Sequence, residues 1–334
     1  MKTQIKFNKP KAKPILGKQG YGTIIFILFL VSFTCATAQQ EPIFSFYGQQ
    51  LNLVNPAVAG LDNGSITLVH RSQWTDVPQA PQTTAFSFGT PWSNGLGGGV
   101  SVWSDKTFVE QQTLVSADFS YKVQLNTAYN LYMGLKASGD FYNLNLTGLE
   151  TFNAIADPAL SNISRLTPNA GLGFYLEHKR YFISLSAPRL FENKRAKEED
   201  GMFIAATNRV HYYLSGGASF PLGALWSFEP TAIFRKVGGA PVSAEVTGIL
   251  SFQERFRFGT GYRSSGSLSG LLMVGVTKDL HIGYAYDTDR RSGLATVGGN
   301  SHEILMQFNL GRKSKLAIEQ EENQKELPTE DEDN

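Results

Sequence analysis

The feature that most constrains this chain is an alternation of apolar and polar residues that recurs about fourteen times. In the last occurrence, Ile304, Met306 and Phe308 fall on one face, and Glu303 and Gln307 fall on the other. Side chains of a strand point to opposite faces in turn, so each stretch has one apolar and one polar face. Because the chain also carries a secretion signal, we expect an all-β fold, a transmembrane antiparallel up-and-down β-barrel of about 14 strands.

Residues 1–38 are predicted to be a cleaved signal peptide. Six lysines precede an apolar run from Ile24 to Phe33, and Ala36-Thr37-Ala38 fits an A-x-A cleavage site. The run is shorter than the roughly 20 residues of a membrane helix, which disfavours a retained anchor. Cys35 raises a lipoprotein alternative, but Thr34 is a poor residue before a lipidated cysteine.

Removal of the signal peptide changes the net charge of the chain and the reactive side chains that it contains. It takes away six lysines and no acid, leaving 24 basic and 29 acidic residues, a net charge of −5. This balance does not suit a nucleic-acid-binding protein. The only cysteine leaves as well, which excludes disulfides and cysteine metal sites in the mature chain.

The connections between the predicted strands support a barrel independently of the alternation. The predicted strands are residues 65–74, 83–90, 96–104, 113–123, 129–138, 169–178, 180–188, 210–220, 225–236, 241–251, 255–263, 268–277, 280–288 and 302–311. Every second connection is short, and the intervening set contains the long ones: Thr75–Gln82, Asp105–Gln112, Gly139–Pro168, Arg189–Arg209 and Arg290–Ser301. Bacterial barrels show this pattern, with short periplasmic turns, long outer loops and both termini in the periplasm.

The predicted barrel, residues 65–311, has a segment on either side. Residues 39–64 contain Asn55-Pro56 and Ala59-Gly60, and predict turns or a short plug at the periplasmic mouth. Residues 312–334 are predicted to be an acidic, disordered periplasmic tail, because 316–334 contain eight acids and one lysine. A solvated tail is favoured over a docking peptide.

The polar residues predict no catalytic, cofactor or metal site. Ser301-His302-Glu303 looks like a triad, but neighbouring strand residues point to opposite faces, so the three side chains cannot meet. The five histidines lack the spacing of metal ligands.

Two groups of side chains are predicted to have positions typical of a membrane barrel. Tryptophans are placed in interfacial girdles, namely Trp74, Trp92, Trp103 and Trp226. Charged residues are placed in the lumen, namely Arg71, Arg255, Arg257, Arg263 and Asp287.

Six short motifs, in this order and spacing, resemble the PorP/SprF family. They are Glu41-Pro42-x-Phe44-Ser45-x-Tyr47, Asn55-Pro56-Ala57-x-Ala59-Gly60, Arg71-x-Gln73-Trp74, Pro78-Gln79-Ala80-Pro81-Gln82-Thr83, Tyr284-x-Tyr286-Asp287 and Ser301-His302-Glu303-Ile304. The closer likeness is to the SprF branch, which is paired with a giant gliding adhesin. Sixteen motif positions become candidates for structure or docking: Pro42, Phe44, Tyr47, Asn55, Pro56, Ala59, Gly60, Arg71, Gln73, Trp74, Tyr284, Tyr286, Asp287, Ser301, His302 and Glu303.

The resemblance implies a non-enzymatic outer-membrane component of the type 9 secretion and gliding machinery. It implies three kinds of partner: the C-terminal domain of a large secreted adhesin, other components of the machinery, and outer-membrane lipid. The chain would support secretion and surface anchoring of that adhesin. The alternative is an outer-membrane porin for small solutes, suggested by the lumen arginines. An outer-membrane hydrolase is a third class, disfavoured because no Ser/His pair has a suitable spacing.

Overall fold

The computed structural model describes residues 44–75, 77–146, 162–195, 198–199, 202–203, 206–288 and 300–311. The chain separates into two units, residues 1–38 and 39–334, and only the second contains described residues. The predicted signal peptide, Pro42 and the predicted tail 312–334 therefore lie outside the described residues.

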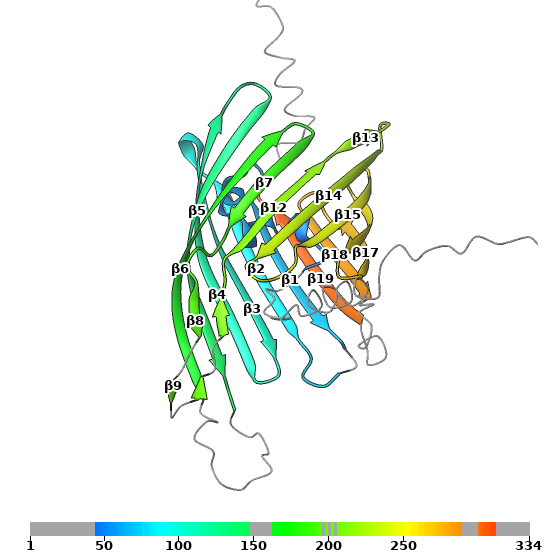
Figure 1. The fold of residues 1–334 in the computed structure, drawn as a ribbon. Coiled ribbons are helices and arrows are strands. Elements are labelled where there is room, and N and C mark those ends of the chain that lie inside the picture. Colours follow the sequence, from blue (N-terminus) through cyan, green and yellow to red (C-terminus); the bar gives the residue numbers. More distant parts are fainter. Residues whose placement is uncertain are drawn as a thin grey trace, which may run out of the picture. The chain divides into compact units, whose positions relative to one another are not determined.

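Fourteen strands close into an antiparallel barrel (Figure 1). They are β1 (Ser65–Gln73), β2 (Gln82–Pro91), β3 (Leu96–Thr107), β4 (Glu110–Gln124), β5 (Tyr129–Leu144), β6 (Ile163–His178), β7 (Tyr181–Ala187), β12 (His211–Ala218), β14 (Trp226–Val237), β15 (Ser243–Phe252), β16 (Phe256–Arg263), β17 (Leu268–Gly275), β18 (Leu280–Thr288) and β19 (Asn300–Asn309). Each of these strands pairs with its neighbours in the chain, and β1 pairs with β19 to close the ring. The all-β, 14-stranded barrel predicted from the alternation is confirmed.

Five further strands are short. β13 (Phe220–Leu222) pairs with the start of β14, next to the place where β12 ends. Between β7 and β12, β8 (Asn193–Arg195) pairs with β11 (Ala206–Asn208), and β9 (Glu198–Glu199) pairs with β10 (Met202–Phe203). These pairs prolong the connection between β7 and β12 as an antiparallel ribbon.

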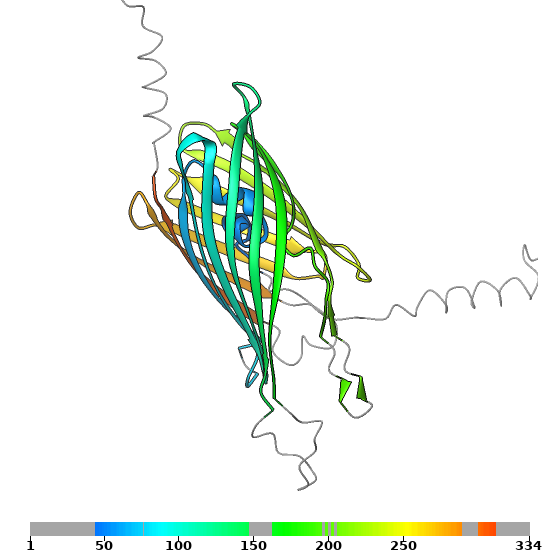
Figure 2. The same cartoon turned by 90° about the vertical axis from the view of Figure 1, so that its left-hand side faces the viewer.

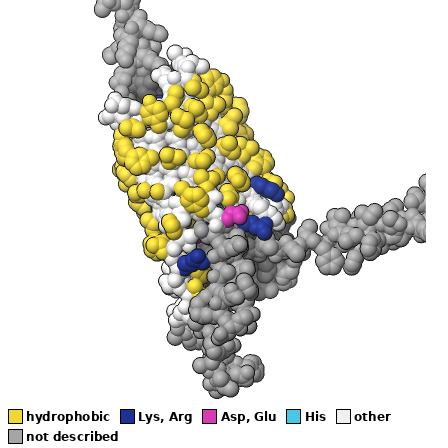
Figure 3. Space-filling view, turned by 60° about the vertical axis from the view of Figure 1, so that its left-hand side comes forward, with side chains coloured by type: hydrophobic (Ala, Val, Ile, Leu, Met, Phe, Trp, Pro, Cys, Tyr) yellow, Lys and Arg dark blue, Asp and Glu magenta, His cyan; other side chains and the backbone are white. Residues whose placement is uncertain are grey.

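The outer face of the barrel is apolar, as the alternation requires. Leu135, for example, is 68% exposed, whereas Lys136 beside it is 2% exposed and points inward. Apolar side chains cover the outer face of the described strands in the space-filling view (Figure 3). A soluble protein rarely exposes so large an apolar surface, whereas a lipid-facing barrel requires one. Among the described residues, no helix is long and apolar enough to cross a bilayer.

The two ends of the barrel differ in the connections that they carry. At one end, which we call the short-turn end, Lys179 and Arg180 join β6 to β7, and residues 253–255 join β15 to β16. At the other end, the loop end, the connections include residues 145–162 and 289–299. The prediction of a long connection at Asp105–Gln112 is wrong. Thr107 and Glu110 are paired, so only Phe108 and Val109 form that turn.

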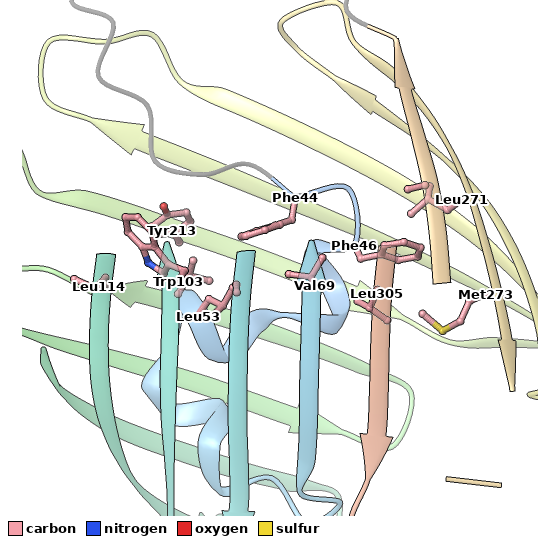
Figure 4. Packing of buried hydrophobic residues seen from close by; sticks show 13 residues of the cluster. Phe44, Phe46, Leu53, Val69, Trp103, Leu114, Tyr213, Leu271, Met273 and Leu305 are labelled. Carbon is pink, nitrogen blue, oxygen red and sulfur yellow. The ribbon is translucent and has the colours of Figure 1, made fainter. Parts of the chain in front are cut away.

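A helical segment, residues 44–61, lies inside the barrel (Figure 2). It comprises η1 (Tyr47–Gln49), α2 (Leu51–Val54) and η2 (Pro56–Gly60). We call this segment the plug. Phe46 is 1% exposed, and it belongs to a buried cluster with Val69, Leu305 and Met273 from the strands (Figure 4). The plug therefore lies deeper than the position at the mouth predicted for residues 39–64.

Candidate functional site

The plug is seated on parts of the wall that lack side chains. A Cβ atom at Gly134 of β5 would overlap the backbone of Pro56 and Ala57, and one at Gly173 of β6 would overlap the side chain of Asn55. Glycine at these positions lets the plug backbone approach the strands closely. The shape of the lumen thus matches this segment.

The first of three polar ties holds the start of the plug to the seam between β1 and β19. Glu303 accepts hydrogen bonds from the backbone N–H groups of Ser45 (2.7 Å) and Phe46 (3.1 Å). Its carboxylate also pairs with Arg71 of β1 at 3.1 Å, and Arg71 pairs with Asp287 of β18 at 2.7 Å. We call Arg71, Asp287 and Glu303 the seam clamp. Because Glu303 is fully buried, its charge is stabilised by these partners rather than by water.

The seam clamp continues along the wall to β16 and β15. Arg263 of β16 lies 3.5 Å from Asp287 and pairs with Glu245 of β15 at 2.8 Å. Ser267 donates a hydrogen bond to Asp287 at 3.0 Å. Arg71 and Arg263, which were predicted to face the lumen, do so, but both are engaged in ion pairs.

The second tie comes from Lys136 of β5, whose side chain is completely buried. Its ammonium group lies 2.9 Å from Asp118 of β4 and 3.4 Å from the backbone carbonyl of Asn52 in the plug. This ion pair was not predicted from the sequence. It could have been found, because both side chains occupy inward positions of adjacent strands and face each other in the register.

The third tie is Asn55, which also shapes the plug. Its Oδ1 accepts a hydrogen bond from Ala57 N–H at 2.9 Å and so caps η2, with Pro56 at the first helical position. Its Nδ2 donates to the Phe174 carbonyl (3.0 Å) and to Ser184 Oγ (2.8 Å) in the wall. One side chain thus fixes both the local turn and its place against β6 and β7.

Thirteen of the fifteen described motif positions divide into two groups by the direction of the side chain. The plug or lumen holds Phe44, Tyr47, Asn55, Pro56, Ala59, Gly60, Arg71, Asp287, Ser301 and Glu303. The outer face holds Tyr284, Tyr286 and His302, and Tyr284 OH lies 2.7 Å from His302 Nδ1. Gln73 and Trp74 are half-buried at the loop-end limit of β1. The inward group is brought together around the plug, and Ser301 and Glu303 do face away from His302.

Two predicted placements are wrong. Trp103 was assigned to an interfacial girdle, but it is 7% exposed and packs in the lumen against Leu53, Leu114 and Tyr213. Arg255 was assigned to the lumen. It lies instead in the turn before β16, with an exposed side chain whose Nε donates to the Gly275 carbonyl. Trp92 and Trp226 are exposed on the outer face, as a girdle requires.

Two small cavities lie beside the plug toward the loop end. One cavity, lined by Trp103 and Arg189 among others, has a volume of about 20 Å³, and a second, lined by Tyr213 and Arg263 among others, has the same volume. Each is large enough for about one water molecule. Within the described residues, no cluster of three or more His, Cys, Asp or Glu side chains is placed to hold a metal ion.

Comparison with known proteins gives one family and several distant structures. The family model described as "Type IX secretion system membrane protein PorP/SprF" matches residues 36–308. None of the curated proteins matches the chain. Among solved structures, the outer membrane protein Omp33 of Acinetobacter baumannii is 8% identical, with a TM-score of 0.45 over 75% of this chain and 98% of that one.

Two further solved structures, of a transporter and of a channel, show a similar level of likeness. The toluene transporter TbuX of Ralstonia pickettii is 11% identical, with a TM-score of 0.47 over 79% of this chain and 94% of that one. The CymD monoaromatic hydrocarbon channel is 10% identical, with a TM-score of 0.46 over 80% and 94% of the two chains. At these TM-scores the likeness carries no argument about function.

Proposed function

Because the chain belongs to the PorP/SprF family of type IX secretion system membrane proteins, we propose that it supports secretion and surface anchoring of one large cell-surface adhesin by binding that adhesin's C-terminal domain. The chain is a non-enzymatic outer-membrane β-barrel of this secretion system. The match does not separate the PorP and SprF branches, so the gliding role of the SprF branch is part of the proposal. The family match over most of the chain is the observation that carries it.

We orient the barrel with the short-turn end in the periplasm and the loop end outside the cell. Both ends of the strand sequence, Ser65 and Asn309, then lie on the periplasmic side, and the chain beyond Asn309 continues from there. The first described residue, Phe44, lies within the lumen and does not show on which side the N-terminal end lies. Of the two termini predicted to be periplasmic, we therefore propose that position here for the C-terminal end.

The hairpin of β5 and β6 supports docking at the loop end. Each strand has 16 residues, and they stay paired from Tyr129 and His178 to Leu144 and Ile163. A tilted strand needs only about 10 residues to cross the hydrocarbon. In our orientation the remainder of both strands, which we call the arm, lies outside the cell, and β4 stays paired with β5 as far as Leu144 there (lower end of the barrel in Figure 2). Loops on a rigid scaffold are well suited to binding.

A shortened arm tests this proposal. Replacing residues 141–166 by a two-residue turn removes the projecting part and leaves the membrane-crossing part of both strands. We expect the adhesin to disappear from the cell surface while other secreted proteins stay at wild-type amounts. The control variant replaces residues 289–299, another loop-end connection, by a two-residue turn between Thr288 and Asn300. Heat-modifiable mobility in gels verifies that both barrels fold. Wild-type surface adhesin with the shortened arm would contradict the docking role.

The lumen arginines, which suggested the porin alternative, do not support it. Arg71, Arg263 and Asp287 belong to ion pairs around the plug and do not line an open channel. We therefore expect the wild-type barrel to show no stepwise conductance in planar bilayers. Regular conductance steps from the purified wild-type protein would favour a solute porin.

A further inference from the structure

A cavity lies at the short-turn end of the barrel, beneath the plug. It has a volume of about 430 Å³, within the usual range of ligand pockets. We call it the vestibule. Gln49 and Asn52 of the plug, Phe182 of β7 and Gln307 of β19 line it. The lining combines side-chain amides with an aromatic surface, since Phe182 stacks on Tyr175 at a ring distance of 5.2 Å.

The vestibule has unused hydrogen-bonding groups. Among the described contacts, the side chains of Gln49, Asn52, Thr247 and Gln307 have no hydrogen-bond partner. Amide side chains can each donate and accept, which is the pattern that a polypeptide backbone matches. These groups face a space that is large enough for a segment of chain.

The rim of the vestibule carries two basic side chains. Lys179 and Arg180 form the turn between β6 and β7, line the vestibule and have no ion pair among the described residues. The other charged residues that line the vestibule, leaving His178 aside, are already engaged. Glu229 pairs with Arg257, and Glu177 accepts a hydrogen bond from Tyr132. Lys179, Arg180 and Arg257 against Glu177 and Glu229 leave the vestibule lining with a net charge of +1, which suits an acidic occupant.

We propose that the occupant is the chain's own acidic segment, residues 316–334. This segment carries eight acids and one lysine. The chain reaches residue 312 just after Asn309, which itself lines the vestibule. The 23 residues from 312 to 334 can extend up to about 75 Å, so the segment reaches the vestibule without strain. Lys179 and Arg180 bind its carboxylates, the amides bind its backbone, and the tail shields the site from other ligands.

Cysteine accessibility tests the proposal. In a Cys35→Ser background, Ser219→Cys places one thiol among the residues that line the vestibule, and an uncharged maleimide reports how fast it reacts. We expect deletion of residues 312–334 to raise the labelling rate about tenfold, because a tail docked nine-tenths of the time leaves the site open for the rest. Substituting Lys179 and Arg180 by alanine in the full chain should give a similar rise.

Two further measurements complete the test. Ser93→Cys places the thiol in an exposed turn that does not line the vestibule, and its labelling rate should not depend on the tail. A synthetic peptide of residues 316–334 should restore protection to the truncated chain. Equal labelling of the Ser219→Cys thiol with and without the tail would overturn the proposal, as would a peptide without effect. No adhesin enters these measurements, so their failure is distinct from failure of the proposed function.

Discussion

The seam clamp makes the plug sensitive to a single substitution, Glu303→Gln. The carboxylate of Glu303 holds Ser45 N–H, Phe46 N–H and Arg71 at 2.7, 3.1 and 3.1 Å. Glutamine keeps the shape, but it loses the charge and turns an NH₂ group toward one of these donors. A hydrogen bond to a charged group contributes about 1.5–3 kcal/mol, and breaking a buried ion pair costs about 3–5 kcal/mol.

We take about 3 kcal/mol as the loss of plug docking in the Glu303→Gln protein, which corresponds to about a hundredfold larger population with the plug released. Planar-bilayer recordings are the assay, because a released plug leaves a lumen that conducts ions. We expect brief openings in the Glu303→Gln protein that the wild type lacks. Ser301→Ala is the matched control, since Ser301 faces the lumen on the same strand and is buried. A Glu303→Gln protein that folds normally and stays as silent as the control refutes the reasoning.

Two other substitutions test the remaining contacts of the plug. Gly134→Val should displace the plug, because its side chain would overlap Ala57, whereas Gly270→Ala has open space around it and should leave conductance unchanged; bilayer recordings compare the two. Lys136→Met leaves Asp118 buried without its partner and should lower the free energy of unfolding by about 3–5 kcal/mol, measured by urea titration in detergent. The double substitution with Asp118→Leu should recover part of that loss, and no recovery would show that the ion pair is not the cause.

The strands were predictable because lipid imposes a simple rule on them. Where both faces of a strand are constrained, as in residues 113–123 and 280–288, the alternation marks the strand well. The prediction failed at residues 105–112, where β3 and β4 continue with polar residues on both faces. Beyond the apolar band, strand pairing no longer requires apolar side chains, so the alternation stops before the strand does.

The candidate site was predictable only in part. The two-residue alternation along each strand placed Arg71, Asp287 and Glu303 on the inner face. The same alternation places Trp103 on the inner face too, because it lies two residues after the inward-facing Ser101. The contacts of the plug could not be predicted. Ser45 and Glu303 are 258 residues apart, and a short irregular helical segment has no periodicity to show which wall it packs against.

Affinity purification from gently solubilised outer membrane tests the central claim most directly. A tag follows Asn334, and mass spectrometry identifies the proteins recovered with the wild-type chain and with the shortened β5–β6 arm. The account predicts one very large secreted protein in a fixed ratio to the wild-type barrel, and its loss with the shortened arm. A wild-type barrel recovered without such a protein would contradict it.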